Sequence, residues 1–89
     1  MANNVGYVSK TLDADTGADK TITLDIKEFQ LIYNASANVV TLNLDNATSE
    51  ANYITLAAGQ KIENWKQPCH VLYYKAGADN STVYIIGNR

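Results

Sequence analysis

The sequence has little of what metal sites and covalent catalysis need. It contains one cysteine, Cys69, and one histidine, His70, in 89 residues. A single cysteine excludes a disulfide within the chain, and this pair cannot supply the three or four ligands of a zinc site. Neighbours on an extended segment point to opposite faces, so Cys69 and His70 are also badly placed for a thiolate–imidazole pair. We therefore predict a protein that is not an enzyme and that holds no metal or cofactor.

Charge is also scarce. Charged residues make up 18% of the chain, below the roughly 25% that is usual for soluble domains, and the formal net charge is −2. The seven basic residues are scattered along the sequence. A nucleic-acid-binding protein needs basic residues gathered on one surface to contact phosphates. We expect no nucleic-acid partner.

Long apolar runs are missing as well. The longest, such as residues 83–86, are far too short to span a bilayer. Residues 1–4 have no basic start and are followed by no apolar stretch of the kind that marks a secretory signal. Together with the lone Cys69, these absences predict a protein made in a reducing compartment, with no membrane partner.

What the sequence does contain is alternation of apolar and polar residues. In residues 21–26, Ile22, Leu24 and Ile26 share one face of a predicted strand. Further strands are predicted at residues 5–12, 29–33, 39–44, 53–56, 61–65, 71–76 and 82–86. About eight short strands with turn residues between them predict one all-β domain over residues 1–89. Its expected architecture is an antiparallel, jelly-roll-like β-sandwich.

Two pairs of these strands are predicted to form β-hairpins. The first joins residues 29–33 to 39–44 through five turn-forming residues, and the second joins 71–76 to 82–86. In the first pair the alternation places six side chains inward: Phe29, Leu31, Tyr33, Val40, Leu42 and Leu44. We expect this pair to be the best-defined unit of the fold.

The last two strands are apolar on both faces, because the residues between the inward ones are also apolar. A strand that is apolar on both sides is normally covered on both sides. A folded-over loop, the N-terminal segment and another subunit are all open as the cover. We predict Val71, Tyr73, Tyr84 and Ile86 as interface residues, and residues 1–10 as a docking arm.

Two weaker candidates have simple structural alternatives. Residues 13–19 carry alternate carboxylates around Gly17, but they lack the glycine and glutamate positions of an EF-hand loop, so a solvated connection is favoured. Trp65 and Tyr53 are candidates for stacking on a sugar ring. The favoured alternative for Trp65 is that it caps one end of the core with its N–H at the surface.

Three segments near the carboxyl end form a further pattern. Residues 54–62 (ITLAAGQKI) join a strand to an Ala-Gly turn, and residues 71–76 (VLYYKA) and 82–87 (TVYIIG) follow. This pattern, with the segment 29–44, resembles small virion proteins of tailed bacteriophages. That group includes capsid decoration (cement) proteins, head-fibre bases and collar or tail components.

The resemblance implies a structural role on the capsid exterior, after synthesis in the cytoplasm of a host bacterium. It implies binding to the major capsid protein or another virion protein, commonly as a homo-oligomer, with a trimer favoured. The leading interpretation is therefore a capsid decoration protein. The alternatives are a carbohydrate- or receptor-binding module that uses Trp65, and a head-to-tail or collar adaptor.

Overall fold

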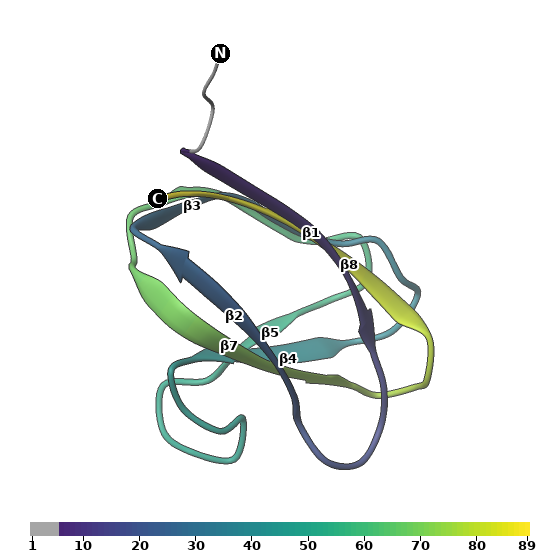
Figure 1. The fold of residues 1–89 in the computed structure, drawn as a ribbon. Coiled ribbons are helices and arrows are strands. Elements are labelled where there is room, and N and C mark those ends of the chain that lie inside the picture. The colour runs from purple at the N-terminus through teal and green to yellow at the C-terminus, as the bar shows by residue number, and fades with distance from the viewer. Residues whose placement is uncertain (1–5) are drawn as a thin grey trace.

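Eight β-strands make up the regular structure of the computed structural model, which describes residues 6–89 (Figure 1). They are Tyr7–Ala14 (β1), Lys20–Ile26 (β2), Glu28–Asn34 (β3), Val40–Leu44 (β4), Ile54–Leu56 (β5), Lys61–Trp65 (β6), Cys69–Ala76 (β7) and Ser81–Asn88 (β8). Each predicted strand has a counterpart among them. Residues 6–89 contain no helix, and hence none that could cross a membrane.

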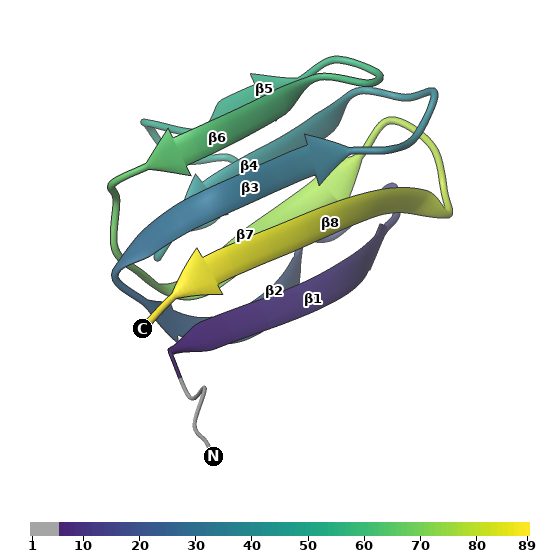
Figure 2. The ribbon, with the colours of Figure 1, turned by 90° about the horizontal axis from the view of Figure 1, so that it is seen from above.

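The strands form two antiparallel sheets of four strands each, packed face to face. The order is β1-β8-β3-β6 in the first sheet and β2-β7-β4-β5 in the second. Seen from above, β1 lies over β2, β8 over β7, β3 over β4 and β6 over β5 (Figure 2). This is the strand order of a jelly roll. The predicted all-β sandwich is confirmed.

Both predicted hairpins are wrong. β3 pairs with β6 and β8, whereas β4 pairs with β5 and β7. Likewise, β7 and β8 belong to different sheets. The connections 35–39 and 77–80 therefore cross from one sheet to the other. Backbone hydrogen bonds hold these crossings in place, from Gly77 N to Val39 O (2.9 Å) and from Ala35 N to Thr82 O (3.0 Å).

The core lies between the sheets and is built from the inward residues of both. Its large members have essentially no exposed surface: Leu24, Phe29, Ile32, Leu42, Leu56, Leu72 and Ile85. Burying each such side chain contributes roughly 1.5–3 kcal/mol. Ile22 and Leu44, both predicted inward, are half-buried and pack against this cluster. The alternation therefore identifies most of the core correctly.

In β3, however, the inward set differs from the prediction. The pairing of β3 with β8 shifts between Phe29 and Leu31, so Gln30 is an extra residue in the strand. Such a β-bulge reverses the alternation beyond it. Phe29 and Ile32 are consequently buried, whereas Leu31 and Tyr33 lie half-buried on the outer face of the sheet.

Part of the predicted docking arm belongs to the sandwich. Residues 7–10 form the first half of β1 and pair with β8. The two ends of the described chain also meet, because Arg89 N donates to Gly6 O at 2.7 Å. Residues 1–5 of the predicted arm lie outside the described residues.

Candidate functional site

The structure divides the four predicted interface residues between two opposite surfaces. Tyr84 and Ile86 lie in β8, on the outer face of the β1-β8-β3-β6 sheet. Val71 and Tyr73 lie in β7, on the outer face of the β2-β7-β4-β5 sheet. Because the two sheets pack with their inner faces together, these outer faces point away from each other. The four residues therefore do not form one patch.

On the first sheet, Tyr84 and Ile86 join two residues that the sequence prediction placed inward. Ile86 pairs with Leu31 across the strands, and Tyr84 pairs with Tyr33. Directly opposed residues on one face of a sheet have their Cβ atoms about 4.5–5.5 Å apart. Leu31, Tyr33, Tyr84 and Ile86 therefore form a contiguous apolar patch, and we call this side of the protein the aromatic face.

Its centre is an ordered pair of rings. Tyr33 and Tyr84 stack with their centroids 6.2 Å apart and their planes 19° apart. Within the chain, 42% of Tyr84 stays exposed. Stacking fixes both rings, so a partner that binds here meets a preformed surface and little side-chain entropy is lost.

Polar residues border the aromatic face on two sides. Ser9 and Thr11 of β1 pair with Ile86 and Tyr84. On the other side, Lys61 and Glu63 of β6 pair with Tyr33 and Leu31. Lys61 Nζ lies 3.9 Å from Glu63 Oε1, and both side chains are more than half exposed. The border is hydroxyl-bearing on one side and carries one charge of each sign on the other.

A shallow hollow opens between β3, β6 and the turn before β6. It has a volume of about 380 Å3 and is lined by Leu31, Tyr33, Gly59, Lys61 and Glu63. The backbone of Gly59 has φ of 75°, and a side chain there would point into open space. The volume is at the low end of the roughly 300–1,000 Å3 typical of small-molecule sites.

The opposite outer face is partly covered by the chain itself. Residues 45–53 form a loop below the second sheet (Figure 1). Asn43 points outward beside Tyr73 but is buried, because its Nδ2 donates to Ala47 O (2.9 Å) and Ala51 O (3.3 Å) of this loop. Asp19 anchors the loop through Thr48. Its carboxylate accepts from Thr48 N at 2.7 Å and also from the Thr48 hydroxyl.

Val71 and Tyr73 are half-buried on this second face. The sequence allows a folded-over loop, the N-terminal segment or another subunit as the cover of an apolar face. A folded-over loop is present at the outer face of the β2-β7-β4-β5 sheet. The aromatic face has no such loop among residues 6–89.

Trp65 and Tyr53 are not brought together as a stacking site. Trp65 pairs with the fully buried Phe29, and their rings stack at 5.6 Å. Half-buried at the end of β6, Trp65 packs against the core of the first sheet. Tyr53 is exposed beside β5 of the second sheet. These positions agree with the interpretation of Trp65 as a cap of the core.

The acidic segment 13–19 uses its carboxylates to hold loops together. Asp15 accepts a hydrogen bond from Asn80 N at 2.9 Å and forms an ion pair with Lys20 at 2.6 Å. The bond from Asn80 N, followed by that from Lys20, lowers the pKa of the Asp15 carboxyl. Thr16 donates through its N–H and its hydroxyl to Asp79, in the crossing between β7 and β8. Nowhere in residues 6–89 do three or more His, Cys, Asp or Glu residues form a group suited to a metal.

Cys69 and His70 point into different environments. Cys69 is buried in the core, and loss of solvent raises the pKa of its thiol to about 12. His70 is exposed, and its Nδ1 hydrogen-bonds to Asp25 Oδ1, which raises the pKa of the imidazole. A thiol with such a pKa is un-ionised at neutral pH and is a poor nucleophile.

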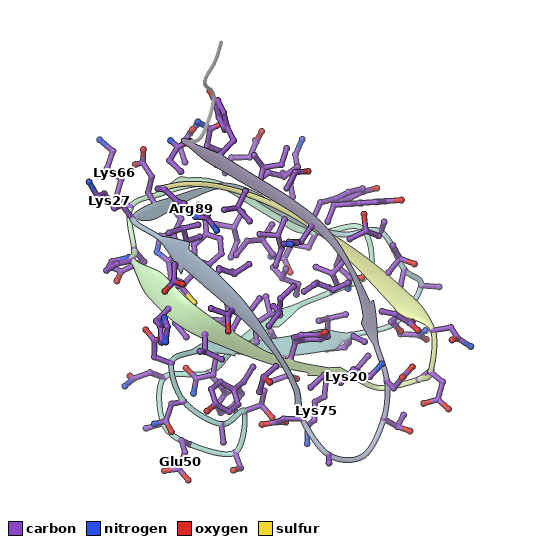
Figure 3. All side chains as sticks on the ribbon, in the orientation of Figure 1. Lys20, Lys27, Glu50, Lys66, Lys75 and Arg89 are labelled. Carbon is purple, nitrogen blue, oxygen red and sulfur yellow. The ribbon has the colours of Figure 1, made fainter. Side chains whose placement is uncertain are left out.

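The cations do not gather on either face. Lys27, Lys66 and Arg89 lie at one end of the sandwich, whereas Lys20 and Lys75 lie toward the other (Figure 3). The remaining two, Lys10 and Lys61, lie in β1 and β6, the two edge strands of the first sheet.

Comparison with known proteins gives no match to a family model, a curated protein or a solved structure.

Proposed function

We propose that the protein is a structural component of a bacteriophage virion, a capsid decoration protein without enzymatic activity that binds the coat shell. The observation that carries the proposal is the placement of half-exposed apolar residues on both outer faces. Val71 and Tyr73 lie on one side, and Leu31, Tyr33, Tyr84 and Ile86 lie on the other. A domain with contact residues on two sides can be held by two neighbours at once, as a cement protein requires.

The composition of these faces supports the proposal. Ser9 and Thr11 border the aromatic face at β1, and Thr21, Thr23 and Asn43 neighbour Val71 and Tyr73 on the other face. Neutral polar groups of this kind cost less to desolvate than charged ones. Each copy offers only a shallow contact. Many copies on one shell would sum their weak contacts by multivalency, without deep pockets in any one of them. The jelly-roll architecture is itself common among capsid and lectin domains.

Two measurements test the coat-binding role. Mass spectrometry of purified virions should detect this chain at a fixed ratio to the coat protein. The protein should sediment together with purified empty capsids. Val71→Glu should weaken this binding, because it places a charge on the outer face of the β2-β7-β4-β5 sheet. Gln67→Glu adds the same charge at the exposed connection before β7 and serves as the matched control. Absence from virions, together with failure to pellet, would refute the proposal.

A carbohydrate-binding role is the second candidate, and the hollow beside Tyr33 is the observation that favours it. A sugar ring could stack on Tyr33 while Lys61 and Glu63 hydrogen-bond to its hydroxyls. A glycan array tests this role directly. Tyr33→Ala should abolish binding without unfolding the protein, since Tyr33 lies on the outer face.

A further inference from the structure

The aromatic face has an order of side chains that matches a second copy of itself. Its two central rows run across all four strands. One row is Ser9, Ile86, Leu31 and Glu63, and the other is Thr11, Tyr84, Tyr33 and Lys61. Between them runs the row of Lys10, Ile85, Ile32 and Ile62, which occupies inward-facing register positions.

Consider a two-fold axis in the plane between two facing copies, directly above this middle row and parallel to it, so that it runs perpendicular to the strands. It places each strand over the same strand of a second copy and exchanges the two outer rows. Lys61 then lies over Glu63 of the second copy, and Glu63 over its Lys61. In the centre, Tyr33 lies over Leu31, and Tyr84 over Ile86. At the β1 side the hydroxyls of Ser9 and Thr11 meet.

The pairings between the two exchanged rows are favourable, whereas the exposed Lys10, at the β1 end of the middle row, lies nearest to its own copy. The two charge pairs are opposite in sign, the central pairs join an aromatic to an aliphatic side chain, and the remaining pair is hydroxyl to hydroxyl. The match extends one row outward, where Tyr7 lies over Asp13 of the second copy and its phenol can donate to the carboxylate. Tyr7 is 60% exposed, so it is free to make this contact.

From this order of charged and apolar side chains, we propose that the aromatic face binds a second copy of the protein as an isologous two-fold dimer. The inference rests on the proposed assembly role and leaves the face with Val71 and Tyr73 to contact the coat. The virion-protein resemblance favours a trimer, whereas the order of charges on this face fits a two-fold pair.

The expected dimer is weak. Four strands about 4.8 Å apart and four rows about 7 Å apart give a contact on the order of 500 Å2 per copy. Stable complexes bury roughly 800 Å2 per partner. We therefore expect a dissociation constant in the micromolar range. Sedimentation experiments over a wide series of protein concentrations measure it.

A charge exchange tests the geometry. Lys61→Glu places two carboxylates opposite each other at both ends of the β6 contact, and Glu63→Lys does the same with two ammonium groups. Each single variant should weaken self-association at least about tenfold. The double variant Lys61→Glu/Glu63→Lys should dimerise again. A mixture of the two single variants should form a heterodimer, because one chain then presents two carboxylates and the other presents two ammonium groups.

The controls separate this dimer from other outcomes. Lys66→Glu and Glu50→Lys change charge by the same amount away from the aromatic face and should leave association unchanged (Figure 3). A monomer at all concentrations, a trimer, or single variants that associate like the wild type would overturn the proposal. Capsid binding is measured separately, so a monomer that still binds the shell would refute the dimer and leave the decoration role standing.

Discussion

At the scale of single residues, Asn34 is the most constrained polar side chain. It is fully buried at the end of β3. Its Nδ2 donates to Asn38 O (2.7 Å), Leu56 O (3.0 Å) and Ala57 O (3.1 Å), and its Oδ1 accepts from the N–H and hydroxyl of Ser36. One amide thus joins the β3–β4 crossing to the turn after β5.

We predict that Asn34→Ala lowers the free energy of unfolding by about 2–4 kcal/mol, since it leaves several buried groups without partners. Urea denaturation measures this loss. Asn46→Ala is the matched control, because Asn46 is exposed and its side chain bonds, within residues 6–89, only to the neighbouring Ala47 N. That change should stay within about 0.5 kcal/mol. Equal effects of the two substitutions would contradict the role of Asn34.

Gly87 is a residue whose lack of a side chain is required by packing. A Cβ at this position would lie 2.6 and 2.9 Å from Ile26 side-chain atoms and 3.2 Å from Glu28 O. Gly87→Ala should therefore destabilise the protein by about 1–3 kcal/mol.

Gly77→Ala is the control for this prediction, because a Cβ there would approach only Val39 O, at an ordinary 3.8 Å. Adding Ile26→Val to Gly87→Ala removes the nearest atom, Ile26 Cδ1, and should recover part of the loss. Thermal unfolding of the wild type, Gly87→Ala, Ile26→Val and the double variant forms a double-mutant cycle. A loss that Ile26→Val does not reduce would show that crowding is not the cause.

At the scale of elements, the bulge in β2 creates a pH-dependent contact. The pairing of β2 with β7 shifts between Thr23 and Ile26, and Asp25 adopts a positive φ of 52°. This places the Asp25 carboxylate against His70 at the start of β7. The carboxylate raises the pKa of His70 above its ordinary value, so the folded state binds the proton more tightly than the unfolded state.

The stabilisation is therefore complete below the unfolded pKa of about 6.5 and is lost as pH rises through the higher folded pKa. We predict that the urea midpoint of the wild type falls relative to that of His70→Gln between about pH 6 and pH 8. Because both side chains are exposed, the effect is small. Asp25→Asn should remove the same dependence. A constant difference between wild type and His70→Gln across this range would contradict the prediction.

The positions of the strands can be predicted from the sequence, whereas their pairing cannot. Alternation identifies the strands and most inward residues, because period-two burial is a local property. Strand pairing is not local. A five-residue connection can close a hairpin or cross between sheets, and both outcomes leave the same alternation in the flanking strands. The segment 35–39 crosses from one sheet to the other, and hydrogen bonds from the Asn34 side chain and the Gly77 N–H hold it there.

The candidate site was predictable only in part for the same reason. Tyr84 and Ile86 stand out as apolar residues on a face that should be polar. Leu31 and Tyr33 were missed because the bulge at Gln30 leaves no clear mark in the alternation, which continues through Phe29, Leu31 and Tyr33. Val71 and Tyr73 were placed with Tyr84 because β7 and β8 look like a hairpin in the sequence.

At the scale of the whole molecule, the two outer faces are separated by the core. Stacked sheets lie about 10 Å apart, and side chains on the two outer faces point in opposite directions. Tyr84 contacts Tyr33 in the first sheet, whereas Val71 neighbours Thr23 in the second, so they share no pairing partner. The faces should therefore behave as independent binding surfaces on one rigid body.

This independence is testable with Tyr84→Ser and Val71→Ser. Their effects on the free energy of unfolding should add within about 0.5 kcal/mol, because distant sites without shared partners rarely couple. Tyr84→Ser should weaken self-association by removing the exposed half of the stacked pair, while Val71→Ser leaves it unchanged. Capsid binding should show the opposite ranking. At concentrations where the protein is monomeric, Val71→Ser should lower the affinity for capsids more than Tyr84→Ser does. Coupling above about 1 kcal/mol would instead mean that the core transmits change from one face to the other, and the two surfaces would then have to be treated as one site.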